Sequence, residues 1–373
     1  MNTVLTELIR QSIRAHGPIS FARFMHQALY HPEHGYYSSG RCAIGRKGDY
    51  FTNVSVGPLF GEFLAAQFAE MWERLGSVED FTIIEQGAHD GQFARDVLES
   101  VQKRAPEFFA ALRYRIVEPF PILRDRQSRT LERFRDKVEW RDSLQPFLGV
   151  HFSNELLDAM PVRLINGSME KLVDLEDDKF VFVERPISQQ ATFQPPPQRD
   201  AFNQAALDWI DDVAAKLQRG YVVAFDFGRL EDEFQGDVQV RAQHRNLDSP
   251  FEQIGHADIT MPVEWSTIIE RAQANGLRVA GFTDQHHFLT GIISTWPDLL
   301  QARSGNSTAL SSRVQLAAAD RKTKRELQTL LHPEMLGRAF QVLALEKNVP
   351  AGAPRLAGFK FEREPRNVRK VPR

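Results

Sequence analysis

The segment Phe81-Thr82-Ile83-Ile84-Glu85-Gln86-Gly87-Ala88-His89-Asp90-Gly91 joins an apolar run to a glycine-rich turn, and residues 92–103 have a helical pattern. This order predicts a buried strand, a tight turn and a helix. Gly87 and Gly91 would let the backbone turn sharply and approach a ligand closely, while the N–H groups at the helix start can bind a carboxylate or phosphate. Because similar turns also serve as plain connectors, the segment alone indicates a nucleoside site only weakly.

Short apolar runs alternate with helical stretches beyond this segment. Strands are predicted at 81–84, 114–117, 138–140, 149–152, 221–226, 278–282 and 339–345, and helices at 92–103, 122–134, 200–218 and 263–275. This alternation predicts an α/β fold with a mostly parallel sheet and helices on both faces. Two helices are also predicted within 2–30 and one within 57–75, whereas the polar stretch 229–258 is expected to form a loop.

The same patterns predict the division of the chain. Residues 161–200 interrupt the alternation with three short runs that are typical of antiparallel strands, and we interpret them as an insertion. The predicted parts are a helical lid segment at 1–76, the first half of the core at 77–160, a β-rich insertion at 161–200, the second half of the core with helical additions at 201–361, and a basic tail at 362–373.

Composition excludes several classes of protein. The net charge of −3 gives no general case for binding nucleic acid, and no stretch is apolar enough to predict a membrane span. A single cysteine, Cys42, excludes a disulfide framework and a cysteine-rich zinc site. The histidines have no metal-ligand spacing, so no metal site is predicted. Since the first residues lack the apolar core of a signal peptide, we expect a cytoplasmic protein.

An acidic residue follows the next predicted strand. Glu118 ends the run Tyr114-Arg115-Ile116-Val117-Glu118, 27 residues after Gly91. An acid at this place in a nucleotide-binding sheet can accept hydrogen bonds from both ribose hydroxyls. The turn and the acid together favour an adenine nucleoside, and His89, where a dinucleotide fingerprint would have its second glycine, counts against NAD.

Two further loops follow strands of the predicted sheet. In the first, Asp142 or Ser143 could meet an adenine base, although a helix-capping role is equally consistent with these residue types. In the second, Asn154 could lie near the reacting part of the donor, and Glu155 and Asp158 would share a face if Glu155 begins a helical turn. Such a carboxylate pair can bind a guanidinium or take its proton, but acids in a first helical turn also serve as caps.

Several longer motifs resemble the MidA-like class I methyltransferases, which include the mitochondrial complex I assembly protein arginine methyltransferase. The resemblance covers about residues 6–346 and rests mainly on Ala28-Leu29-Tyr30-His31-Pro32-Glu33-His34-Gly35-Tyr36-Tyr37, Gly48-Asp49-Tyr50-Phe51-Thr52, Gly57-Pro58-Leu59-Phe60-Gly61-Glu62 and Ser153-Asn154-Glu155-Leu156-Leu157-Asp158-Ala159-Met160-Pro161-Val162. Asp226-Phe227-Gly228 and the run from Asp258 to Trp265 are similar to that family as well.

The resemblance implies a Rossmann-like fold with a seven-stranded sheet, S-adenosylmethionine as the methyl donor, and a role for particular residues. It assigns the acceptor side and catalysis to Glu155 and Asp158. His31 is a further catalytic candidate and, like His34, could belong to the acceptor pocket, because the loop around these residues is polar and aromatic. The resemblance assigns donor binding to Asp49, Tyr50, Phe51, Thr52, Glu85, Gly87, Ala88, Gly91, Glu118, Ser143, Leu144 and Asn154. Within that set, Gly87 and Gly91 would lie under the methionine part, Glu118 on the ribose, and Ser143 and Leu144 near adenine.

Departures from the family leave the acceptor open. The family's first turn is close to Gly-Pro-Gly-Arg-Gly, whereas this chain has Gly-Ala-His-Asp-Gly at 87–91. The leading hypothesis is methylation of a protein arginine, with a respiratory complex subunit as one protein substrate. The alternatives are O- or N-methylation of a small molecule, and a non-catalytic assembly protein that keeps a donor-binding fold. A homodimer is one oligomeric state that the resemblance allows.

Overall fold

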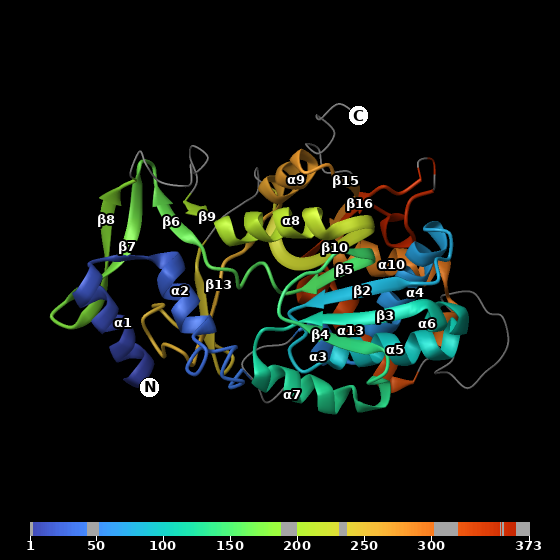
Figure 1. The fold of residues 1–373 in the computed structure, drawn as a ribbon, viewed down its shortest axis with the longest axis horizontal. Coiled ribbons are helices and arrows are strands. Elements are labelled where there is room, and N and C mark those ends of the chain that lie inside the picture. Colours follow the sequence, from blue (N-terminus) through green and yellow to red (C-terminus); the bar gives the residue numbers. More distant parts are fainter. Residues whose placement is uncertain are drawn as a thin grey trace. The chain divides into compact units, whose positions relative to one another are not determined.

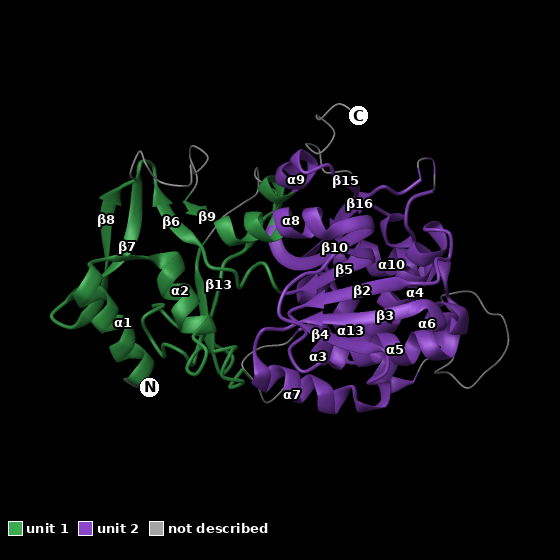
Figure 2. Cartoon of the chain, viewed as in Figure 1, with its two compact units in different colours: residues 1–51, 156–210, 229–268 green, residues 52–155, 211–228, 269–373 purple. Residues whose placement is uncertain are grey.

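The computed structural model describes residues 3–42, 52–187, 200–230, 237–301, 320–350, 352 and 354–362. The chain forms two compact units, which Figure 2 distinguishes by colour. The first contains residues 1–51, 156–210 and 229–268, and the second contains 52–155, 211–228 and 269–373. No helix in the described ranges is long and apolar enough to cross a bilayer.

A twisted, mostly parallel sheet runs through the second unit (Figure 1). Seven of its eight strands lie in the order β15-β16-β10-β5-β2-β3-β4, and among these seven all pair in parallel except β16, which is antiparallel to both of its neighbours. The bounds are β2 Phe81–Gln86, β3 Leu112–Val117, β4 Val138–Arg141, β5 Phe147–Asn154, β10 Leu217–Arg229, β15 Arg278–Asp284 and β16 Phe340–Lys347. All seven predicted strands are present and the mostly parallel sheet is confirmed; the eighth strand, β14 Val263–Glu264, lies where a helix was predicted to begin.

Strand pairing brings distant parts of the chain to one edge of this sheet. Gln86 is in register with Val117 of β3 and with Ser153 of β5. The residues that follow these three strand positions, including Glu118 and Asn154, therefore lie at the same height along the strand direction. In parallel sheets, ligands bind at this carboxyl edge.

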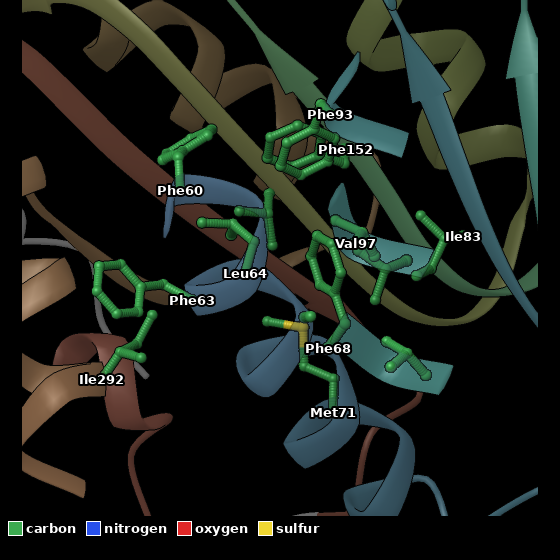
Figure 3. Close-up of a cluster of buried hydrophobic side chains, with 14 of the residues drawn as sticks. Phe60, Phe63, Leu64, Phe68, Met71, Ile83, Phe93, Val97, Phe152 and Ile292 are labelled. Atoms are coloured by element: carbon green, nitrogen blue, oxygen red, sulfur yellow. The ribbon is translucent and has the colours of Figure 1, made fainter. Parts of the chain in front are cut away.

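Burial on both faces explains why the central strands have nearly continuous apolar sequences. Every residue of β2 from Phe81 to Glu85 is buried. Figure 3 shows how Phe60, Phe68, Phe93 and Phe152 lie together in the core beside this sheet, and the rings of Phe93 and Phe152 stack with centroids 4.3 Å apart. Such aromatic packing accounts for part of the unusual number of phenylalanines, 27 in all.

Helices complete the second unit, and several of them pack against one another. α4 lies against α5 and α10, and α13 lies against α3, α4 and α10. The helices of this unit and those that cross its limits are α3 Asn53–Val56, α4 Leu59–Arg74, α5 Gln92–Arg104, α6 Pro106–Ala111, α7 Pro121–Thr130, α8 Gln204–Lys216, α9 Trp265–Ala274, α10 Gln285–Thr295, α11 Asp298–Gln301 and α13 Arg321–Leu331.

The first unit combines two helices with small antiparallel sheets. Its helices are α1 Thr3–His16 and α2 Phe21–Tyr30, and β1 Ile19–Ser20 pairs with β7. The segment 161–200 contains β6 Arg163–Asn166, β7 Met169–Glu176 and β8 Lys179–Pro186, and β9 Ala201–Phe202 pairs with β6. Val173 of β7 packs with Ile19, Phe21 and Phe24 in a core of this unit's own.

One expectation about the first unit was wrong. The stretch 229–258 contains β11 Gln239–Ala242 and β12 Arg245–Asn246, and β11 also pairs with β13 Asp258–Thr260. Val240, Ala242 and Ile259 are buried. The polar composition led to the wrong prediction of a loop because these short strands bury few side chains and are stabilised mainly by cross-strand pairing.

Gly61 is required where α4 crosses α5. A Cβ atom at Gly61 would lie 2.7 Å from the Cβ of Asp96 and 3.3 Å from the backbone nitrogen of Val97. We predict that Gly61→Ala lowers the free energy of unfolding by about 1–3 kcal/mol, because overpacking outweighs the roughly 1 kcal/mol that alanine gains over glycine in a helix. Urea denaturation tests this. Unchanged or raised stability would show that the helices can separate at no cost.

Candidate donor and acceptor site

The glycine-rich turn connects the end of β2 to the start of α5. Gly87 and Gly91 both have a φ of 80°, a conformation that glycine adopts without steric cost. The turn is closed by a hydrogen bond from the Gly91 nitrogen to the Ala88 oxygen, at 2.8 Å. His89 has a φ of 46°, so a residue with a Cβ occupies the left-handed region, at a typical cost of about 1–2 kcal/mol. The turn thus keeps its glycine-like shape although the middle residue is histidine.

Glu85 lies at the end of β2, directly before this turn, and is fully buried. Its carboxylate accepts a hydrogen bond from the Tyr114 hydroxyl of β3 at 2.7 Å. Burial raises the pKa of Glu85 to about 8, more than the hydrogen bond from Tyr114 lowers it. At neutral pH this carboxyl group is therefore largely protonated.

His151 of β5 is a second buried titratable group below the turn. Its Nε2 atom lies 2.7 Å from Oε1 of Gln86. Burial lowers the pKa of His151 to about 3, so the ring stays neutral at physiological pH. Glu85 and His151 therefore both contribute polar atoms without a charge.

Glu118 follows β3, as predicted, and its carboxylate is buried. Oε1 accepts a hydrogen bond from the Phe120 nitrogen at 3.1 Å, and Oε2 accepts one from Nε2 of Gln127 at 3.1 Å. Burial raises the pKa of Glu118, while those hydrogen bonds and the nearby charge of Arg124 oppose the shift. A carboxylate can accept about four hydrogen bonds, so acceptor capacity remains for a ligand.

The loop after β4 carries the residues predicted to lie near adenine. Leu144 is buried, whereas Ser143 is exposed, with its hydroxyl accepting a hydrogen bond from Gln145. Asp142, the other candidate in this loop, forms an ion pair with Arg124. Arg124 also donates to the backbone oxygen of Glu118, so this loop is tied to the end of β3.

A chain of polar side chains lies at the end of β5. Asn53 donates from Nδ2 to Oδ1 of Asn154 at 2.9 Å, and Asn154 donates from Nδ2 to Oε1 of Glu155 at 2.8 Å. The Asn53 nitrogen donates to the same Glu155 oxygen at 3.4 Å. Thr52, the one described residue of the predicted group 49–52, caps α3 with its side chain. Asp49, Tyr50 and Phe51 lie outside the described residues.

Glu155 does not begin a helical turn, so the condition under which Glu155 and Asp158 would share a helical face is not met. The φ of Glu155 is 54°, and no helix follows it through residue 160. The backbone leaves β5 with a hydrogen bond from the Glu155 nitrogen to the Phe225 oxygen of β10, at 2.9 Å. A residue with this φ is not itself in the α-helical conformation. The argument from a shared helical face of Glu155 and Asp158 therefore fails.

Asp158 and His31 belong to the first unit and are described there. Asp158 is buried, and its backbone oxygen accepts a hydrogen bond from the Met261 nitrogen at 2.8 Å. The neighbouring Ala159 oxygen accepts one from the Tyr30 hydroxyl at 3.0 Å. His31 caps the end of α2 and stacks on His34, with ring centroids 5.1 Å apart.

Sequence reasoning missed Asn53 and Gln127. Asn53 follows directly after the predicted 49–52 group, so its position in the chain offered a signal that went unused. Gln127 is on the helix after Glu118 and has no motif around it; its burial and contacts come only from the three-dimensional structure.

A family model described as "Putative S-adenosyl-L-methionine-dependent methyltransferase" matches residues 63–283, more than half of the chain. The chain belongs to this methyltransferase family. The match includes the glycine-rich turn, Glu118 and the Asn154–Glu155 segment, so the site described above lies within it. The predicted family, the class I fold and methyltransferase activity are therefore confirmed.

Comparison with individual proteins supports membership of this family. The chain is 25% identical over 329 residues to the mitochondrial protein arginine methyltransferase NDUFAF7 homolog of Drosophila melanogaster, a match to 76% of this chain and 74% of that protein. It is 26% identical over 410 residues to mitochondrial NDUFAF7 of Homo sapiens, covering 98% and 87%. Both names include "mitochondrial", so they give the predicted cytoplasmic location no support.

A solved structure extends the likeness to three dimensions and to the donor. A protein from Burkholderia thailandensis, bound to S-adenosyl-homocysteine, superposes with a TM-score of 0.81 at 29% identity, covering 96% of this chain and 95% of that one. S-adenosyl-homocysteine is the product left when S-adenosylmethionine gives up its methyl group. The prediction of S-adenosylmethionine as the methyl donor of this methyltransferase is confirmed.

The residues at the carboxyl edge of the sheet fit this donor. Oδ1 of Asn53 and Oγ of Ser153 are buried and have no hydrogen-bond partner within the described part of the chain. Buried polar atoms are normally paired, so these two oxygens are suited to accept hydrogen bonds from a bound donor. The ammonium, carboxylate and hydroxyl groups of S-adenosylmethionine are partners of the required kind.

The raised pKa of Glu85 predicts a specific dependence of stability on pH. The carboxyl group titrates at its ordinary value of 4.5 in the unfolded chain and at about 8 in the folded protein. The folded state therefore keeps a proton that the unfolded state has released, and stability falls as pH rises between these values. The slope from this one group is about 1.4 kcal/mol per pH unit.

We predict that Glu85→Gln removes this slope, because glutamine still accepts the Tyr114 hydrogen bond but does not ionise. The free energy of unfolding, measured with urea at pH 5.5, 6.5 and 7.5, should fall less steeply in the variant than in the wild type. Glu99→Gln, an exposed position on α5, is the matched control and should keep the wild-type slope. Parallel curves for Glu85→Gln and the wild type would refute the assignment.

Proposed function

We propose that this methyltransferase transfers a methyl group from S-adenosylmethionine to a guanidino nitrogen of a protein arginine. The observation that carries the proposal is Glu155, whose carboxylate follows the end of β5 and is held there by hydrogen bonds from Asn154 and Asn53. The names of the curated relatives, which are protein arginine methyltransferases, support the same acceptor.

Donor binding is assigned to the edge formed by β2, β3 and β5. Gly87, Ala88 and Gly91 would hold the methionine part through backbone groups, and Glu118 would accept hydrogen bonds from the ribose hydroxyls. Further proposed donor contacts come from Glu85, Ser143, Leu144, Asn154, Thr52 and the predicted Asp49, Tyr50 and Phe51. Asn53 joins this set, because its unpaired Oδ1 can accept a hydrogen bond from the donor's ammonium group.

Glu155 acts on the acceptor in this proposal. When bound, S-adenosylmethionine supplies a methyl group on a positively charged sulfur, so placement of the nucleophile does most of the catalytic work. A free guanidinium stays protonated at neutral pH. The Glu155 carboxylate would orient it by charge-assisted hydrogen bonds and accept the proton that the nitrogen releases as it gains the methyl group. Asp158, from the family resemblance, and His31, from its polar and aromatic loop, are proposed to bind the acceptor.

The partner in this reaction is proposed to be a protein, and a respiratory complex subunit is the candidate that the family resemblance implies. Incubation of the enzyme with methyl-labelled donor and cell lysate, followed by mass spectrometry of the labelled product, identifies the acceptor. Label on a protein arginine is the expected result. Label on a metabolite alone would overturn the arginine proposal while leaving donor use intact.

We predict that Glu155→Gln lowers the methylation rate at least about 100-fold, the size of effect expected from loss of a general base, and changes donor affinity less than about threefold. Label incorporation and calorimetric titration with S-adenosylmethionine measure the two effects. The amide can still accept the hydrogen bond from Asn154, so the local structure is kept. Glu107→Gln on α6 is the exposed control. An equal loss of donor binding would assign Glu155 to the donor instead.

A further inference from the structure

Gln127 of α7 is fully buried and connects three parts of the proposed donor site. Its Nε2 atom donates to the backbone oxygen of His89 at 3.0 Å and to Oε2 of Glu118 at 3.1 Å. Its Oε1 atom accepts a hydrogen bond from Nε1 of Trp140 on β4 at 2.9 Å. One amide thus connects the glycine-rich turn, the ribose acid and the strand that leads to the adenine loop.

The chemistry of the partners fixes the orientation of this amide. An indole nitrogen can only donate, so the amide oxygen of Gln127 must face Trp140. The two N–H groups then face two acceptors, the His89 carbonyl and the Glu118 carboxylate, neither of which can donate when Glu118 is ionised. All three hydrogen-bonding groups of the side chain are used, and no rotated amide would satisfy them.

At Glu118, the hydrogen bond from Gln127 occupies one side of the carboxylate. The other oxygen is held by the Phe120 nitrogen. The groups that act electrostatically on this carboxylate are the charged Arg124, on the same helix as Gln127, and the titratable ring of His89, from the turn. With each oxygen fixed by one donor, the remaining lone pairs have a defined direction, as recognition of a cis-diol requires.

At His89, the same amide holds a backbone that departs from the usual preference. His89 is left-handed, at the position where the family usually has glycine. The hydrogen bond to its carbonyl oxygen favours this conformation over alternatives in which the carbonyl would turn away. The histidine can therefore be accommodated without losing the shape of the turn.

We propose that Gln127 is a positioning residue for donor recognition, which sets Glu118 and the glycine-rich turn in one arrangement for the ribose. The proposal rests on the assignment of Glu118 to the ribose in the proposed function. Gln127 itself need not touch the donor, because it acts through the two groups that it holds.

The test compares two ligands, S-adenosyl-homocysteine and its analogue without the 2′-hydroxyl, by calorimetric titration. We expect Gln127→Met to weaken S-adenosyl-homocysteine binding about 10- to 100-fold, the range for a lost hydrogen bond to a charged group. The preference of the wild type for the ribose form over the deoxy form, expected at about tenfold or more on the same basis, should fall below about threefold. If Gln127 had only a structural role, Gln127→Met would weaken the binding of both ligands equally and leave the ratio of their affinities unchanged. That result would overturn the proposal.

Three further variants distinguish the possible outcomes of this test. Gln102→Met, at an exposed position on α5, is the matched control and should leave both affinities unchanged. Gln127→Glu keeps the acceptor for Trp140 but places a carboxyl group against Glu118. It should therefore reduce the ratio of the two affinities, and it provides a test even if Gln127→Met does not fold.

Glu118→Gln separates the proposal about Gln127 from the proposed role of Glu118. If it leaves the ratio unchanged, the ribose assignment fails; if it removes the preference while both Gln127 variants keep it, only the role of Gln127 fails.

Discussion

The parallel pairing of β2 with β3 and β5 is the constraint on which the rest of the site depends. Because Gln86 is in register with Val117 and with Ser153, the chain leaves all three strands at one level. Strand register alone therefore brings the glycine-rich turn, Glu118 and Asn154 together at one edge of the sheet. A register change in one strand would both separate these groups and expose a buried apolar face, so the packing that stabilises the sheet also maintains the site.

The buried polar groups of the sheet divide into neutral and charged sets. Glu85 is held protonated near neutrality and His151 is held neutral, because burial disfavours the charged form of each. Both lie beneath the turn and contribute hydrogen bonds only. Glu118 and Glu155 follow the strand ends, where donors such as the Phe120 nitrogen and Asn154 stabilise a carboxylate.

Sequence patterns predicted the central sheet well, since strands buried on both faces have apolar runs that stand out from their surroundings, as at Phe81–Gln86. The turn and Glu118 were also placed correctly, because they follow directly from strand ends. Prediction failed where tertiary contacts decide the outcome. The sequence left open whether Glu155 begins a helical turn, and the structure shows its backbone held by β10 in a left-handed conformation instead. The strands β11 to β13 depend on pairing that composition does not reveal, and the role of Gln127 depends on Trp140 and His89, which are distant in sequence.

The position of β16 has a consequence for how the protein is made. This strand, Phe340–Lys347, is the last of the sheet to be synthesised, yet it lies between β10 and β15 and pairs with both. Until it emerges from the ribosome, β10 and β15 each have an edge of unpaired backbone groups. Open edges of this kind invite pairing with other chains. The growing chain therefore passes through an aggregation-prone state that lasts until β16 has been synthesised, which gives chaperones a defined period in which to act.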